Sequence, residues 1–353
     1  MPSILPPSDI DEIVQRIKLI VKPLSGKNLL LTGGRGFLGR YLVECLVKFN
    51  AEVLDKPVHI YVLDNLVTAG ELGRGAPTFP NVTFLLHNAI EPFDTNIKFD
   101  YVVHAAGIAS PFHYNARPIE TLDVAVAGTR SMLEIARRDH SRFCFFSSSE
   151  IYGDPDSKHL PIQESYRGNV SCQGPRACYD EGKRVGETLC YIYHEQFGIH
   201  TNTIRPFNVY GPGMQEDDHR VLPSFASCLK ANVPFNVYGT GEQTRTFCYL
   251  TDAIVGFFSV ILLGAPGDAY NIGNPTPEIS MIELVDIMEK IVGRSIERNI
   301  IEHPDSYPTD EPLRRCPSIQ KAKTQFGYEP QVNLEEGLAR FLDWANASFV
   351  GAF

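Results

Sequence analysis

The sequence of 353 residues is poor in three features: clusters of basic residues, paired cysteine motifs and long apolar runs. Its 32 Lys and Arg residues are outnumbered by 42 Asp and Glu residues, which gives a net charge of −10 at pH 7. Proteins that bind the phosphate backbone of nucleic acids depend on clustered Lys and Arg. We therefore expect no nucleic-acid partner for this acidic chain.

Residues spaced as metal ligands or disulfide pairs are also missing. The eight cysteines show no C-x-x-C spacing, and several lie inside apolar segments, which predicts reduced thiols in the core. His87, His104 and His113 lack the spacing of metal ligands. The sequence predicts no bound metal.

Long apolar runs are absent too. The longest, AIVGFFSVILLGA at 253–265, is too short to cross a bilayer and is typical of a buried helix. The first residues, MPSILPPSDIDEIVQR, show neither the basic nor the apolar region of a secretion signal. The composition, 43% hydrophobic and 21% charged, is ordinary for a globular enzyme. We expect a cytoplasmic protein without a membrane partner.

Apolar strands alternate with helices up to about residue 206. The predicted strands cover 27–33, 58–65, 82–89, 99–107, 142–148 and 200–206. The predicted helices cover 9–21, 36–49, 120–139 and 179–198. This alternation predicts an α/β fold with a doubly wound parallel sheet of the Rossmann type.

After residue 206 the elements become shorter and Pro and Gly become more frequent, which predicts a smaller C-terminal α/β lobe over the substrate. The predicted division has three parts. They are an N-terminal helix and lead-in at 1–26, a cofactor-binding domain at 27–206 and about 240–265, and a substrate-binding lobe at about 207–239 and 266–345.

A glycine-rich turn links the first strand to the next helix. Gly33, Gly36 and Gly39 follow G-x-x-G-x-x-G spacing, which allows a pyrophosphate to rest on the helix N-terminus. Such turns also occur for packing reasons alone. Asp64 ends the second strand about 25 residues later, where a carboxylate accepts both ribose hydroxyls of NAD and repels the 2′-phosphate of NADP. The sequence therefore predicts NAD as cofactor.

Further cofactor contacts are expected where other elements begin or end near this turn. The candidates are Phe37, Leu38, Asn65, Asn88, Ala89, Ala105, Ala106 and Pro206.

Tyr179 and Lys183 are four residues apart on a predicted helix, so both project from one face. A lysine ammonium together with the nicotinamide charge would lower the pKa of the tyrosine and make it a base near neutrality. Both residues are also expected to contact the cofactor. In a chain with 15 tyrosines, an unplaced pair of this kind also fits surface packing.

The apolar strand at 142–146 runs into SSSEIYGDP at 147–155. Ser148, Ser149 and Glu150 are catalytic candidates, because they follow a strand end one helix before Tyr179. The alternative is a turn in which the hydroxyls satisfy backbone groups.

Together these motifs resemble the extended short-chain dehydrogenase/reductase superfamily, the NAD-dependent epimerases and dehydratases. Four stretches are similar to its UDP-glucuronate decarboxylase (UDP-xylose synthase) branch, in register from about residue 27 to 342. They are ASPFHYNARPIET at 109–121, SSSEIYGDP, GPRACYDEGKR at 174–184 and YGTGEQTRTFCYLTD at 238–252.

This resemblance implies decarboxylation of UDP-glucuronate to UDP-xylose through a transient 4-keto sugar, with internal hydride return. Tyr179 would remove the proton of the C4 hydroxyl, Ser148 would hydrogen-bond the same oxygen, and Glu150 would act at C5. Dehydratases carry an aspartate at the position of Ser149. A serine there disfavours dehydration, because it is not a useful acid.

Two other functions stay open at this point. One is a 4-epimerase or 4,6-dehydratase acting on a related nucleotide hexose, and the other is a non-enzymatic NAD-binding regulator. The first is suggested by departures from the family pattern at Ala125, Ser171, Cys172 and Ser224, and the second by Ala125. Arg35 and Asn88 are further departures. Intact Tyr179 and Lys183 argue against the regulator.

The resemblance also implies a substrate site and an oligomeric state. The substrate contacts it implies are Tyr114, Asn208, Arg220, Tyr238 and Arg245. Arg220 and Arg314 also fit solvated surface arginines. The expected assembly is a homodimer in which the helices at 120–139 and 179–198 form a four-helix bundle.

Overall fold

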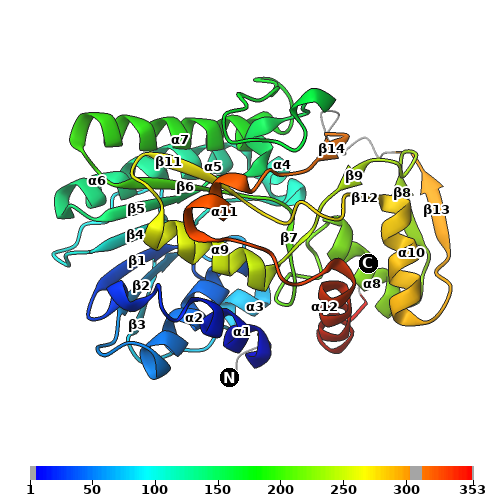
Figure 1. Ribbon diagram of the computed structural model, residues 1–353, viewed down its shortest axis with the longest axis horizontal. Coiled ribbons are helices and arrows are strands. Elements are labelled where there is room, and N and C mark those ends of the chain that lie inside the picture. Colours follow the sequence, from blue (N-terminus) through cyan, green and yellow to red (C-terminus); the bar gives the residue numbers. More distant parts are fainter. Residues whose placement is uncertain (1–4, 303–311, 352–353) are drawn as a thin grey trace.

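A seven-stranded parallel sheet forms the centre of the molecule (Figure 1). The structure is a computed structural model that describes residues 5–302 and 312–351. The strands lie in the order β11 (Asp268–Ile272), β6 (Thr201–Pro206), β5 (Arg142–Phe146), β4 (Tyr101–His104), β1 (Asn28–Thr32), β2 (His59–Asp64) and β3 (Val82–Leu86). Neighbouring strands pair in parallel. The predicted doubly wound α/β sheet is confirmed.

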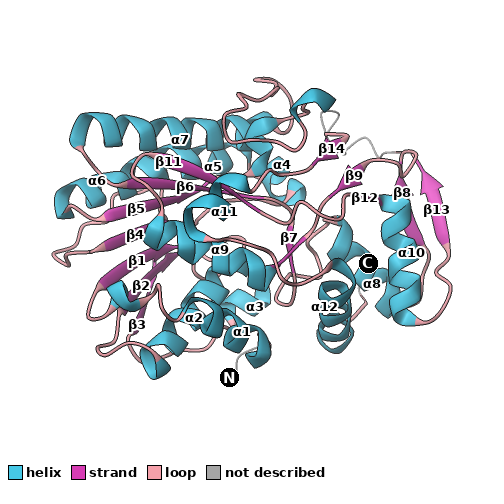
Figure 2. Cartoon of the chain, in the orientation of Figure 1, coloured by secondary structure: helices cyan, strands magenta, loops and turns pink. Residues whose placement is uncertain are grey.

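Helices cover both faces of this sheet (Figure 2). One face is covered by α1 (Pro7–Ile17), α2 (Phe37–Glu52) and α9 (Leu250–Leu263). The other is covered by α5 (Pro118–Asp123), α6 (Thr129–Asp139) and α7 (Ala177–Phe197).

Alternating side chains of each strand supply the two cores. In β1, Leu29 and Leu31 join the apolar cluster that contains residues of α1, α2 and α9. Leu30 points the other way and joins the cluster with α6 and α7. This two-sided burial explains why the strands read as continuous apolar runs rather than alternating ones.

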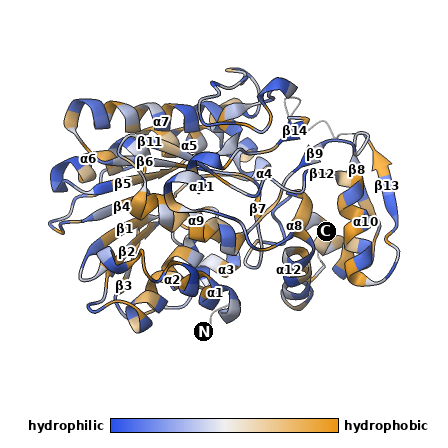
Figure 3. Ribbon diagram, in the orientation of Figure 1, coloured by the Kyte–Doolittle hydropathy of each residue, from blue (hydrophilic) through white to orange (hydrophobic). Residues whose placement is uncertain are grey.

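The apolar run at 253–265 lies mainly in α9, which Figure 3 shows largely in orange. Every residue of this helix from 250 to 262 is buried, as predicted for that segment. Within residues 5–302 and 312–351, no helix is both long and apolar enough to cross a membrane.

The helix predicted at 120–139 is interrupted, so that prediction is wrong in one detail. α5 and α6 are separated by a π-helical turn at Val124–Gly128. The carbonyl of Val124 accepts a hydrogen bond from Nε2 of buried His104 at 3.1 Å, and the other ring nitrogen lies 2.7 Å from the hydroxyl of Thr32. Burial lowers the pKa of His104 to about 3, so the ring is neutral. The helix is therefore tied to strand β4 by a contact that local sequence does not reveal.

The edge strand β11 was also missed. Its residues fall within 266–345, which the sequence analysis assigned to the substrate-binding lobe. β11 instead pairs with β6 along its whole length and extends the large sheet. α11 (Gln320–Phe326) packs on β11 and α9. The other boundaries of the predicted division stay predictions.

In the part of the chain that the structure describes, the smaller lobe contains three helices and several short strands. They are α8 (Val221–Ala231), α10 (Met281–Val292) and α12 (Leu334–Ser348), with β8 (Phe235–Tyr238) paired to β13 (Arg298–Ile301), and β9 (Thr244–Arg245) between β12 (Ile279–Ser280) and β14 (Arg314–Arg315). Two further strands, β7 (Val209–Tyr210) and β10 (Cys248–Tyr249), pair between this lobe and the sheet.

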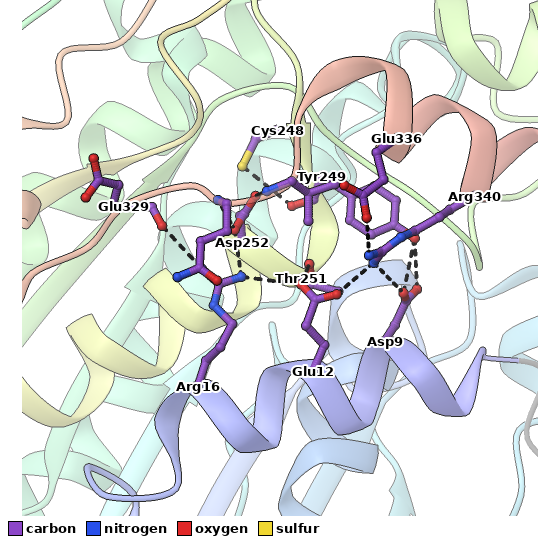
Figure 4. A network of polar contacts seen from close by, with 12 residues as sticks. Asp9, Glu12, Arg16, Cys248, Tyr249, Thr251, Asp252, Glu329, Glu336 and Arg340 are labelled. Atoms are coloured by element: carbon purple, nitrogen blue, oxygen red, sulfur yellow. Dashed lines mark hydrogen bonds and ion pairs between the residues drawn. The ribbon is translucent and has the colours of Figure 1, made fainter. Parts of the chain in front are cut away.

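Charged side chains bind α1 to α9 and α12 (Figure 4). Arg16 donates to the fully buried carboxylate of Asp252 at 2.7 Å. Asp252 also accepts the backbone N–H groups of Gln331 and Val332 at 2.8 and 3.0 Å. Burial raises the pKa of Asp252, and Arg16 together with the two N–H groups opposes that rise.

Replacing Arg16 by methionine tests this anchor. Arg16→Met leaves the Asp252 carboxylate buried without its cation, which we expect to lower the free energy of unfolding by about 3–5 kcal/mol in urea titrations at pH 7. Lys323→Met removes an exposed ion pair to Glu329 and serves as control, with an expected loss below about 1 kcal/mol. Equal losses in the two variants would contradict the proposed role of Arg16.

Candidate active site

The predicted cofactor site begins at the glycine turn between β1 and α2. Gly33 has a φ of +74°, and a Cβ there would lie 2.8 Å from the backbone of Ala106. A Cβ on Gly39 would lie 2.1 Å from the carbonyl oxygen of Gly33, whereas one on Gly36 would meet that oxygen only at 3.4 Å. Internal packing therefore explains two of the glycines. The third, Gly36, is the N-cap of α2 and leaves the helix N-terminus open to a ligand.

Asp64 lies beside this turn at the end of β2. One of its oxygens accepts the N–H of Arg35 and the other accepts the N–H of Leu66, both at 2.8 Å. Each carboxylate oxygen keeps a lone pair for a ribose hydroxyl. Burial raises the pKa of Asp64 above its ordinary value. The turn and the carboxylate fit the diphosphate and ribose of NAD.

The other predicted cofactor residues lie at the same edge of the sheet. Nδ2 of Asn65 donates to Oδ1 of Asn88 at 3.3 Å, and the N–H of Ala106 donates to the hydroxyl of Thr32 at 3.1 Å. Ligands of doubly wound sheets bind at this carboxyl edge. Phe37 and Leu38 open α2, Ala89 follows β3, Ala105 follows β4, and Pro206 ends β6.

Ser148, Tyr179 and Lys183 come together beside this edge. Ser148 lies two residues after the end of β5 and is 8% exposed. Its hydroxyl accepts a hydrogen bond from the N–H of Glu150 at 3.2 Å. Tyr179 is buried, receives a hydrogen bond from Ser148, and stacks on Tyr114 with ring centroids 5.6 Å apart. Nζ of Lys183 lies 5.8 Å from the Tyr179 ring centre and donates to the carbonyl of Phe146 at 2.6 Å.

The expected lowering of the Tyr179 pKa does not follow from the chain's own groups. Burial raises the pKa of Tyr179 to about 12, and the hydrogen bond from Ser148 only partly opposes this rise. Burial also lowers the pKa of Lys183 to about 8, so its ammonium group remains largely protonated at pH 7. In the chain alone, desolvation of Tyr179 outweighs the effect of Lys183. A pKa lowered by Lys183 together with the charge of bound nicotinamide stays a prediction.

Glu150 is held by two buried arginines. Arg315 from β14 contacts both oxygens of the carboxylate, with one N–H···O distance of 2.7 Å. Arg176, immediately before α7, donates to Glu150 through Nη2. The same guanidinium donates through Nε to Asp180 at 3.4 Å. A carboxylate that accepts two guanidinium groups has a fixed orientation next to Tyr179.

Neither arginine was predicted from the sequence as a site residue. Arg176 lies inside the quoted GPRACYDEGKR, but it carried no assigned role. Arg315 is adjacent to Arg314, and only Arg314 was weighed as a possible substrate contact in the sequence. Arg314 is half-exposed and pairs with Glu278 at 2.7 Å, whereas Arg315 is 4% exposed. Neighbouring residues of a strand point to opposite faces, so one of two adjacent arginines turns inward.

The predicted substrate residues are more dispersed. Tyr114 is buried against Tyr179, and Arg220 pairs with Asp218 at 2.8 Å. Asn208, at a φ of +39°, donates to the carbonyl of Thr246.

Two others belong to the smaller lobe. Arg245 is buried and donates to the carbonyls of Thr244 and Leu313, and Tyr238 ends β8. Ser149, the remaining catalytic candidate, is 3% exposed. The roles of these residues stay predictions.

The eight cysteines are all free thiols, and Cys172 is the exposed one among them. In the part of the chain that the structure describes, no group of His, Cys, Asp or Glu side chains could hold a metal ion.

Fold and site together define an enzyme of the NAD-binding Rossmann class with a serine–tyrosine–lysine group at the carboxyl edge of the sheet. Residues 29–273 match the model of the NAD dependent epimerase/dehydratase family. The chain belongs to this family, which confirms the predicted enzyme class and agrees with the predicted cofactor.

Individual relatives refine this placement. The chain is 38% identical over 318 residues to UDP-glucuronic acid decarboxylase 5 of Arabidopsis thaliana, which covers 89% of this chain and 88% of the relative. A UDP-glucuronic acid 4-epimerase from Bacillus cereus, solved with UDP-glucuronic acid and NAD, has a TM-score of 0.78 and 25% identity over 91% of this chain and all of that one. A dTDP-glucose 4,6-dehydratase from Streptomyces venezuelae, solved with NAD, has a TM-score of 0.77 and 25% identity over 91% and 97%.

The glycine turn gives a prediction that separates ligand binding from folding. We expect Gly36→Ala to keep its thermal stability within about 1 kcal/mol of the wild type, since its Cβ has room and its φ is −72°. The added methyl group would obstruct the diphosphate, so titration calorimetry should show NAD affinity reduced by about tenfold or more. Gly39→Ala is the contrasting variant and should unfold at clearly lower temperature. Unchanged NAD affinity in Gly36→Ala would contradict this account of the turn.

Proposed function

We propose that the chain is an NAD-dependent UDP-glucuronate decarboxylase, which forms UDP-xylose and CO2 through a 4-keto sugar. The observation that carries this proposal is the Glu150 carboxylate held by Arg176 and Arg315 beside Tyr179. It occurs in a chain that is 38% identical to UDP-glucuronic acid decarboxylases over most of its length.

The first task of the site is oxidation at the sugar C4. When bound, NAD supplies this chemistry by accepting a hydride from the sugar and returning it at the end. Tyr179 removes the proton of the C4 hydroxyl, and Ser148 hydrogen-bonds the same oxygen. Lys183, fixed by the Phe146 carbonyl, keeps a donor near the tyrosine ring.

The 4-keto sugar of a uronate is a β-keto acid. The bond from C5 to the carboxylate breaks, CO2 leaves, and the electron pair moves toward the C4 ketone oxygen. Ser148 and Tyr179 donate hydrogen bonds to that oxygen, which lowers the energy of the negative charge that develops there. A proton must then be returned to C5. Glu150, whose charge acts on Tyr179 and whose carboxylate is held by Arg176 and Arg315, is the candidate that acts at C5.

Ser149 argues against the dehydratase alternative. Dehydration needs an acid that protonates the leaving C6 hydroxyl, and a buried serine cannot supply one. The epimerase alternative keeps one supporting observation, the similarity to a UDP-glucuronic acid 4-epimerase. A pure epimerase needs no acid or base at C5, so the arginine-held Glu150 favours decarboxylation.

The test is turnover of UDP-glucuronate with NAD, followed by mass spectrometry and CO2 detection. We expect a UDP-pentose and CO2 in equal amounts. Tyr179→Phe should lower the rate by about 10² to 10⁴, since it removes the base. Tyr61→Phe, in β2 of the sheet, is the matched control and should retain activity. A UDP-hexuronate isomer without CO2 would instead support the epimerase, and loss of water would support the dehydratase.

We also propose that the protein is a homodimer through α5 and α7, which lie side by side. Large apolar side chains are exposed on these helices, which is unusual for a monomer surface. They are Ile119 at 70%, Leu122 at 40%, Val185 at 38%, Tyr191 at 61% and Phe197 at 47% exposure. A twofold axis along them would bury these side chains in a four-helix bundle.

A cytoplasmic location stays a prediction from the sequence.

Light scattering on the purified protein tests the dimer. The wild type should have twice the mass of the chain, and Leu122→Glu/Val185→Glu should be a monomer, because charges are costly in an apolar interface. Leu19→Glu, at another exposed leucine, should remain a dimer. A monomeric wild type would refute the proposal.

A further inference from the structure

A largely buried carboxylate and a buried one, Glu150 and Asp180, share one guanidinium next to the catalytic tyrosine. Arg176 donates through Nη2 to Glu150 and through Nε to Asp180. Asp180 follows Tyr179 in α7, and the side chain of Arg176 is 6% exposed and that of Asp180 8% exposed. The guanidinium and the Asp180 carboxylate are therefore largely shielded from water.

The two carboxylates are unequal in their remaining contacts. Glu150 also binds Arg315 through both oxygens. Among residues 5–302 and 312–351, Asp180 has a 3.4 Å contact from Arg176 on one oxygen, and its buried Oδ1 has no hydrogen-bond partner there. An ionised carboxylate loses folding free energy when one of its oxygens is buried without a hydrogen-bond donor. The protonated, neutral carboxyl group loses less.

The charged surroundings point the same way. Burial, followed by the negative charge of Glu150, raises the pKa of Asp180 to about 7, against the opposing effects of Arg176 and Arg315. Among the described residues, the titratable and charged groups that act on Asp180 are Glu150 from the turn after β5, Arg176 and Tyr179 from its own helix region, and Arg315 from β14. Cys178 lies on the same helix turn.

We propose that Asp180 is a positioning residue that competes with Glu150 for the guanidinium of Arg176. When Asp180 carries its proton, Arg176 is committed to Glu150, and Glu150 has the orientation that the sugar requires. When Asp180 loses that proton to solvent, its carboxylate draws Arg176 away from Glu150. The catalytic rate then depends on the protonation of a residue that does not touch the substrate. This inference rests on the proposed decarboxylase function only for the choice of substrate.

The kinetic test compares wild type with Asp180→Asn, which imitates the protonated form and keeps an acceptor for Arg176. The measurement is kcat/KM for UDP-glucuronate with the NAD-loaded enzyme from pH 6 to pH 8.5. We expect similar values at pH 6 and a ratio of variant to wild type that rises about tenfold between pH 7 and pH 8.5, as Asp180 ionises in the wild type only. The difference should lie in kcat rather than KM.

Two controls separate this role from general effects. Glu181→Gln changes the next acid on α7, which pairs with Arg184 at the surface, and should follow the wild-type profile. In an Arg176→Lys background, Asp180→Asn should no longer change the pH profile, since a lysine cannot bridge both carboxylates. Parallel profiles of wild type and Asp180→Asn would overturn the proposal.

A readout without turnover keeps this test distinct from the proposed function. The infrared difference between wild type and Asp180→Asn should contain a protonated-carboxyl stretch that disappears as the pH rises through about 7. If no UDP-glucuronate is decarboxylated at any pH, the proposed function fails while this band still reports on Asp180. If the band is absent at pH 6, Asp180 is ionised there and the competition is refuted.

Discussion

The ion pair between Glu150 and Arg315 joins the two parts of the molecule at the place where chemistry is expected. Glu150 follows the central strand β5, and Arg315 lies on β14 of the smaller lobe. Both are largely buried, so the pair is effective only when the lobes are packed together. Because Arg176 completes the contact from the start of α7, the same carboxylate also fixes the region of Tyr179. The site therefore exists only in the folded whole.

The residues that bind the cofactor and those that act on the sugar differ in how they are brought together. The cofactor half depends on local features: a glycine turn, a carboxylate at a strand end, and a tyrosine and lysine on one helix face. The half that acts on the sugar depends on charges from three separate elements. The low dielectric environment that raises the pKa of Tyr179 to about 12 also strengthens the guanidinium contacts of Glu150. Burial thus makes Tyr179 harder to deprotonate and, in the same site, strengthens the ion pairs of Glu150.

Local pattern was sufficient for the sheet and for the cofactor half, because strand burial and glycine spacing are properties of neighbouring residues. It was insufficient for β11, whose sequence DAYNI contains too many polar residues to be recognised as a strand without its partner β6. It was also insufficient for Arg315, since only the register of β14 decides which of two adjacent arginines turns inward. The π-helical turn at Val124–Gly128 depends on His104, which lies in another element. These features are set by tertiary contacts.

The central claim is that one site oxidises C4, removes the carboxylate from C5 and reprotonates C5. The most direct measurement is turnover of UDP-glucuronate in D2O with NAD, followed by NMR and mass spectrometry of the product. The account predicts a UDP-pentose with one deuterium at C5 and the original hydrogen at C4, because the hydride returns internally while the proton comes from solvent. A product that keeps its carboxylate, or one with deuterium at C4, would contradict it.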